Sequence, residues 1–128
     1  MQDVNNLTIH QNGLLLLKPI YRLANLLPDN EFKFRSQLCE SAKSIPPLIA
    51  EGFAKKRSQK EFKRFLLMAL GSSDEVITHL REIKIIGFPN IKEITCDVLI
   101  KYYKIESKQI NRYIGTIINN QINPKSEI

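Results

Sequence analysis

The chain has 128 residues, of which 43% are apolar and 25% are charged, so its length and composition suit a single globular domain. Nineteen Lys and Arg residues against 13 Asp and Glu give a formal charge of +6, which favours an anionic partner such as nucleic acid, although a protein can also be basic without binding one. The apolar run Leu14–Leu17 is too short for a signal or membrane segment, so we expect a cytoplasmic protein with no membrane partner.

We expect residues 1–128 to form one four-helix-bundle domain, with loose ends at about residues 1–6 and 121–128. The first predicted helix runs from about Leu7 to Leu27. Pro19 removes a backbone donor and crowds the carbonyl four residues earlier, so it predicts a kink or a late helix start. The apolar positions of this helix are Leu14, Leu17, Tyr21, Ala24, Leu26 and Leu27.

The second predicted helix, about Glu31–Ala54, contains the adjacent residues Pro46 and Pro47. Neither proline can donate to the carbonyl four residues earlier. The apolar positions of this helix keep their helical phase across the two prolines, which favours one helix kinked at Pro46-Pro47. The alternative is a break, with Ser44 capping a new helix. The positions that form this stripe along the second predicted helix are Phe34, Leu38, Ala42, Ile45, Ile49 and Phe53.

A tight turn follows at about residues 55–57. Gly52 allows close approach of a neighbouring backbone. Ser58 and Glu61 form a capping box, in which each side chain bonds the backbone amide of the other residue. Glu51 lies between the stripe residues Ile49 and Phe53, so we hypothesise that its carboxylate is partly buried and clamps the turn.

The third predicted helix runs from Ser58 to about Ile86 and ends at Gly87. Gly71, followed by two serines, provides small side chains that permit a close helix crossing. The predicted buried stripe is Phe62, Phe65, Leu66, Ala69, Leu70, Ser73, Val76, Ile77, Leu80 and Ile83.

The fourth predicted helix runs from about Ile91 to Asn120, and its apolar pattern is broad and irregular. Four helices joined by short turns predict an all-α, antiparallel up-down bundle. The apolar positions of the last helix are Ile94, Val98, Leu99, Tyr102, Ile105, Ile110, Tyr113, Ile114 and Ile117.

The best candidate for a binding site is the basic run at residues 55–64. Its cations could neutralise several phosphates, and the adjacent helix N-terminus adds backbone amides. No aromatic RNA-binding motif accompanies them, so we expect recognition of backbone and shape with little sequence preference. Ordinary solvated surface remains the alternative. The cations are Lys55, Lys56, Arg57, Lys60, Lys63 and Arg64.

The sequence offers no argument for an enzyme, and we expect no catalytic residue, cofactor or metal. Glu75 and His79 share a helix face, but the further Glu and Glu-x-x-His motifs of a di-metal bundle are missing, so a surface pair is expected. Cys39 and Cys96 belong to no metal motif and are expected to be buried, reduced thiols.

Several segments around the turn share the order and spacing of a known family. These are Ser44-Ile45-Pro46, Ile49-Ala50-Glu51-Gly52, Ser58, Glu61-Phe62, Phe65-Leu66, Ala69 and Gly71-Ser72. Over about residues 35–80 the chain resembles the bacterial four-helix-bundle proteins encoded in intervening sequences of 23S ribosomal RNA genes. That resemblance implies an up-down helical bundle and kinship with the accessory variability protein of diversity-generating retroelements.

Those relatives assemble as homopentameric barrels with basic surfaces, bind nucleic acid and act with a reverse transcriptase. By resemblance, we expect a cyclic homo-oligomer of five copies. The expected ligand is RNA or another structured nucleic acid, and a reverse-transcriptase-type protein is a candidate partner.

Two hypotheses follow. In the first, a non-enzymatic, oligomeric helical bundle binds nucleic acid through its basic turn and helix start. In the second, the bundle is a protein-interaction or scaffolding module whose basic charge is incidental.

Overall fold

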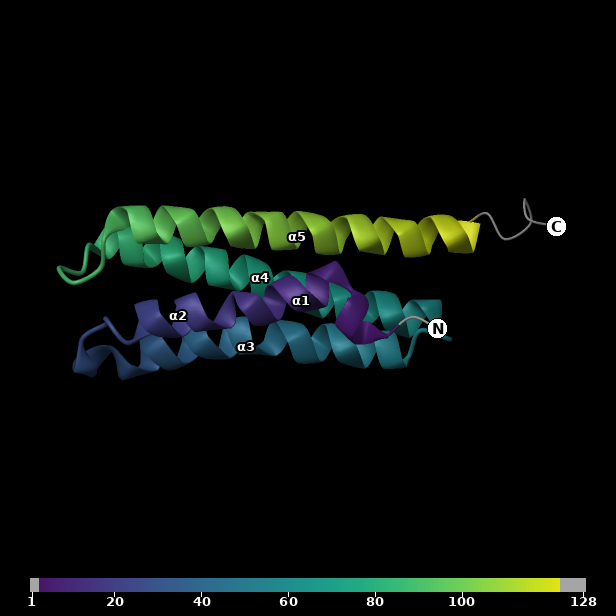
Figure 1. Ribbon diagram of the computed structural model, residues 1–128, viewed down its shortest axis with the longest axis horizontal. Coiled ribbons are helices and arrows are strands. Elements are labelled where there is room, and N and C mark those ends of the chain that lie inside the picture. The colour runs from purple at the N-terminus through teal and green to yellow at the C-terminus, as the bar shows by residue number, and fades with distance from the viewer. Residues whose placement is uncertain (1–2, 123–128) are drawn as a thin grey trace.

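The computed structural model describes residues 3–122, with side chains to Ile117, and every regular element in that range is a helix (Figure 1). No strand occurs among these residues, so the prediction of an all-α four-helix bundle is confirmed. The predictions for residues 1–2 and 123–128 lie outside the described range. The helices are α1 (Thr8–Leu15), α2 (Leu17–Ala24), α3 (Phe32–Ala54), α4 (Gln59–Ile86) and α5 (Glu93–Ile122), with 3-10 helices at Val4–Asn6 and Asp29–Glu31.

Helices α1 and α2 form the first arm of the bundle and are separated only at Leu16. Pro19 lies in the first turn of α2, where its missing amide would have no intrahelical acceptor. The predicted late start is wrong, because α1 already begins at Thr8, and the interruption of the first arm lies at Leu16, three residues before Pro19. Part of the N-terminal segment that we predicted to be loose, Val4–Asn6, is helical, and Val4 packs on the core.

Helix α3 is continuous through Pro46 and Pro47, so the alternative of a helix newly capped by Ser44 is wrong. The Ser44 hydroxyl donates to the carbonyl of Ser41 at 2.8 Å, within the same helix. The uninterrupted stripe explains the continuity, because Ile45 and Ile49 are fully buried on either side of the prolines.

Helix α4 begins and ends where local chemistry predicted. The Ser58 hydroxyl accepts from the Glu61 amide at 3.2 Å, and Gly87 adopts a left-handed conformation with φ of 77°. The reciprocal half of the predicted capping box is wrong. The Glu61 carboxylate pairs instead with Arg64, and the Ser58 amide donates to the carbonyl of Lys55.

The core lies between α3, α4 and α5, with α1 and α2 packed against α3. Helix α5 differs from its prediction, because it has two apolar faces and only one meets the core. The buried face consists of Cys96, Leu99, Tyr103, Ile110, Ile114 and Ile117. Four of the apolar positions given for this helix instead expose 41–64% of their surface, namely Ile94, Val98, Tyr102 and Ile105.

A layer of serine hydroxyls crosses the middle of the bundle. The hydroxyls of Ser44 in α3 and Ser72 in α4 are hydrogen-bonded at 2.8 Å, as are those of Ser107 in α5 and Ser73 in α4. The predicted role of Gly71 is wrong, because Gly71 is exposed and a Cβ added there would meet no atom within 4 Å. The next two residues of α4, Ser72 and Ser73, make the contacts with α3 and α5 instead.

Beside this layer, α5 buries a carboxyl group without a partner. Glu106 exposes 1% of its surface, and neither carboxyl oxygen has a hydrogen-bond partner. A Cβ added to Gly13 of α1 would lie 3.3 Å from Oε2 of Glu106, so glycine makes room for the carboxyl group. Loss of solvation raises the pKa of Glu106 to about 8.

Among the described residues, no helix is long and apolar enough to cross a membrane.

Candidate nucleic-acid interface

The predicted basic site lies at one end of the bundle, where the turn after α3 leads into α4. Figure 1 shows that the N-terminal segment lies near the same end of the bundle and that α5 runs past this end. Lys63 is half-buried and the other five side chains are exposed. The structure therefore brings together the predicted residues Lys55, Lys56, Arg57, Lys60, Lys63 and Arg64. We call this group the basic end.

Two of the six cations are paired with carboxylates of their own helix. Lys55 Nζ lies 3.6 Å from Glu51, and Arg64 donates twice to Glu61 at 3.0 and 3.2 Å. The hydrogen bond from Arg64 lowers the pKa of Glu61 and correspondingly raises the pKa of Arg64. Within residues 3–117, no carboxylate lies within 4.0 Å of the remaining four cations, Lys56, Arg57, Lys60 and Lys63.

The hypothesis that Glu51 is a buried clamp is wrong. Its side chain is 53% exposed and its partner is Lys55 on the same helix, not the start of α4. Ile49 and Phe53 face the core, but Glu51 is two residues from each of them. A step of two residues turns a helix by roughly 200°, so Glu51 faces solvent.

Aromatic rings lie beneath three of the basic side chains. The Nζ atom of Lys56 lies 4.0 Å from the centroid of Phe53, and the Cζ atom of Arg64 lies 4.5 Å from that of Phe65. Lys55 Nζ approaches the same Phe65 ring at 5.7 Å. The charged groups themselves lie over the rings in these cation–π contacts, and all three side chains remain exposed to solvent.

The position of the turn depends on Gly52. A Cβ at this position would lie 3.0 Å from the Cβ of Phe65 and 3.3 Å from the backbone oxygen of Phe62. The predicted close approach of a neighbouring backbone is therefore confirmed. It places the last turn of α3 directly against the first turns of α4, so that both helices contribute to the basic end.

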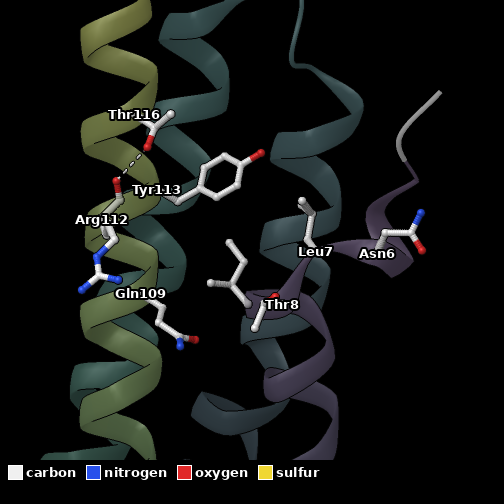
Figure 2. A pocket seen from close by; sticks show the side chains of 8 residues that line it. Asn6, Leu7, Thr8, Gln109, Arg112, Tyr113 and Thr116 are labelled. Carbon is white, nitrogen blue, oxygen red and sulfur yellow. Dashed lines mark hydrogen bonds between the residues drawn. The ribbon is translucent and has the colours of Figure 1, made fainter.

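The sequence interpretation missed the contribution of α5. Arg112 and Tyr113 line a hollow of about 340 Å³ with the N-terminal segment. In Figure 2 the Tyr113 ring projects toward that segment, whereas the Arg112 guanidinium points to the other side of α5. Tyr113 also lines a second hollow of about 210 Å³, together with Lys56 and Gln59. No local pattern marks these residues, because only the folded chain brings α5 beside the turn.

The other candidate residues do not form a second site. His79 lies 3.5 Å from Glu75 and 2.9 Å from Glu82 on one face of α4, so the two predicted residues do lie together, but the His79 side chain is only 12% exposed. In the described part of the chain, no group of three or more His, Cys, Asp or Glu residues is arranged to hold a metal.

Both cysteines are free. Cys96 is buried as predicted and Cys39 is half-buried. Desolvation raises the pKa of each thiol, which keeps it protonated at neutral pH.

Comparison with known proteins addresses the resemblance directly. Residues 5–112 match the family described as 23S rRNA-intervening sequence protein. No curated protein matches the chain. The family match covers all of α1 to α4 and most of α5, and therefore includes every residue of the basic end. The chain belongs to the 23S rRNA-intervening sequence protein family.

Proposed function

We propose that this protein is a non-enzymatic, cytoplasmic, oligomeric bundle that binds RNA or another structured nucleic acid through its basic end. The observation that carries the proposal is the set of four cations without a carboxylate partner among the described residues, gathered at one end of the bundle, where Lys56 also lies over the Phe53 ring. Cations that are not neutralised within the protein are available to phosphates. Nothing in this arrangement favours particular bases, so recognition is of backbone and shape.

Binding of a fluorescently labelled RNA hairpin, measured by anisotropy at several salt concentrations, tests this proposal. Replacing Lys60 and Lys63 together by Gln should weaken binding and reduce the salt slope by about 2, since each phosphate contact contributes about 0.9. The matched control replaces Lys33 and Lys92, which are exposed and lie outside the basic end. If both double variants lose affinity equally, the charge effect is general and the basic end is not the site.

The proposal includes the arrangement of the helices. Successive arms alternate in direction, as the short connections between them favour, and α3 bends at Pro46-Pro47. The missing amides of the two prolines support a bend, because two carbonyls of the preceding turn lose their usual donors.

The proposed self-assembly uses an exposed apolar surface between the first arm and α5. Leu15 and Leu26 expose 73% and 45% of their surface and lie beside the exposed face of α5. Two hollows of about 380 and 360 Å³ run along this boundary. We call these residues the apolar stripe: Leu15, Leu26, Ile94, Val98, Tyr102 and Ile105.

The occupant that we propose for the apolar stripe is a second copy of the chain. At roughly 150–200 Å² per large side chain, the six residues expose on the order of 500 Å², near the upper limit for a monomer. A standard interface buries about 800 Å² per partner, so the stripe could form most of its apolar centre. The five-membered ring expected from the family resemblance needs a second, different surface. Leu67 and Met68 of α4, exposed by 47% and 44%, are candidates for it.

Light scattering tests the assembly. Val98→Glu and Tyr102→Glu should each reduce the mass of the particle, because each buries a charge in the proposed interface. Asn111→Glu, an exposed position elsewhere on α5, should leave the mass unchanged. A parent protein that is monomeric at micromolar concentration would contradict self-assembly, and the apolar stripe would then support the alternative of a scaffold for another protein.

A further inference from the structure

We propose that the two hollows on either side of Tyr113 hold an unpaired nucleotide, so that the protein prefers single-stranded RNA segments to a continuous duplex. This inference rests on the proposed function and adds a ligand class to the basic end. The two hollows are neighbours, because Tyr113 and Thr116 line both of them. Their walls come from the N-terminal segment, the turn after α3, the start of α4 and the C-terminal half of α5.

The lining of the hollows suits an anion that has a flat, polar base. Of the residues around them, Lys56 and Arg112 are cationic and none is acidic. Gln59 and Gln109 supply carboxamides, which can both donate and accept, and the Gln109 oxygen already accepts from Asn12 at 3.2 Å. Figure 2 shows Tyr113 and Gln109 projecting from α5 toward the N-terminal segment. Phosphate would be met by Lys56, and base edges by the carboxamides.

Tyr113 is the candidate stacking surface. Its ring is half-buried and contacts the ring of Phe62, whose centroid lies 5.7 Å away at an interplanar angle of 60° and which lines the second hollow with it. Phe62 is itself 6% exposed and cannot move aside easily. A ring held in this way can stack with any base, and such stacking contributes about 1–3 kcal/mol per base.

The depth of the tyrosine distinguishes an unpaired base from a duplex. Lys60 and Lys63 lie outside both hollows, where a duplex backbone can reach them. The Tyr113 ring is recessed between α5 and its neighbours, so only a base that has left its stack can approach it. Duplex binding should therefore depend on the lysines alone, and single-strand binding on the lysines and the tyrosine.

Anisotropy with a single-stranded RNA and a blunt duplex of equal length tests this inference. Tyr113→Leu should weaken single-strand binding about fivefold or more, as the loss of one stacked base predicts, and should change duplex binding less than about twofold. Tyr113→Phe should bind like the parent, because it keeps the ring. Tyr21→Leu, at an exposed tyrosine outside both hollows, is the matched control and should also bind like the parent.

A second measurement keeps the test decisive if Tyr113→Leu does not fold. A 2-aminopurine in the single-stranded RNA should lose fluorescence when the parent protein binds it, because stacking on the ring quenches the emission. The inference is overturned if the emission does not change, or if Tyr113→Leu weakens the binding of the single-stranded RNA and of the duplex equally. The proposed function still stands if replacing Lys60 and Lys63 weakens the binding of both RNAs. A parent protein that binds neither RNA overturns both proposals.

Discussion

Replacing Glu106 by Gln should make the protein more stable at neutral and alkaline pH. The carboxyl group is 1% exposed and has no hydrogen-bond partner, so the folded protein favours its neutral form. Burial raises its pKa from 4.5 to about 8. Because the folded state binds this proton more tightly than the unfolded chain does, the contribution of Glu106 to stability is greatest below pH 4.5. It decreases as the pH rises toward 8.

The expected size follows from the same pKa values. Between pH 4.5 and about pH 8, the free energy of unfolding should fall by about 1.4 kcal/mol for each pH unit. From pH 5 to pH 7, where the unfolded chain has mostly lost the proton and the folded protein has kept it, the loss is roughly 2–3 kcal/mol. Glutamine has nearly the same shape and cannot ionise, so Glu106→Gln should remove this loss. Tyr103, one turn earlier on α5, has a pKa raised by burial and stays neutral over this range.

Urea unfolding followed by circular dichroism at several pH values between 5 and 8, at one protein concentration, measures the effect. The quantity of interest is the difference between Glu106→Gln and the parent, which should grow with pH. Glu40→Gln, at an exposed position on α3, removes the same charge and should give a constant difference. If the difference for Glu106→Gln is also constant, the carboxyl group is ionised or hydrated in the folded protein, and the reasoning is refuted.

Three local changes give further predictions for thermal unfolding. Gly52→Ala should destabilise the protein by about 1–3 kcal/mol, because its Cβ would lie 3.0 Å from that of Phe65. Gly71→Ala, where the added Cβ meets nothing, should instead stabilise α4 by about 0.5–1 kcal/mol; the same sign for both changes would contradict the assigned contacts. Ser58→Ala should cost about 1 kcal/mol through loss of the cap, and Ser58→Asp should restore it.

The parts of the fold that were predicted correctly depend on local chemistry. Ser58 and Gly87 mark the ends of α4, because capping involves only residues a few positions apart. Most of the predicted buried stripe of α4 is buried, because its positions follow one helical period, although Phe65 and Leu70 are half-buried.

Helix α5 was predicted poorly because its second apolar face, including Ile94 and Val98, merges with the first in a one-dimensional pattern. Glu106 gave no signal either, since a glutamate is ordinarily exposed and its burial depends on the space left by Gly13 on another helix.

The candidate site shows the same division. A run of cations is visible in any sequence, and the six predicted residues do lie together because they are neighbours in the chain. Their carboxylate partners and the supporting rings follow from helical spacing only once the helix boundaries are known. The approach of Arg112 and Tyr113 to Lys56 depends on the packing of α5, which no nearby residue encodes.

The serine layer has a consequence for how the helices align along their axes. Sliding α4 by one turn, about 5.4 Å, would separate Ser72 from Ser44 and Ser73 from Ser107. Ser73 is fully buried, and a buried hydroxyl left without a partner costs about 1–3 kcal/mol. Ser44, Ser72 and Ser107 are half-buried, so their loss would be smaller. The hydrogen bonds between these hydroxyls therefore favour one axial position of α4 relative to α3 and α5. That position decides which residue of α5 arrives beside Lys56, so a few serines in the middle of the bundle determine the composition of its basic end.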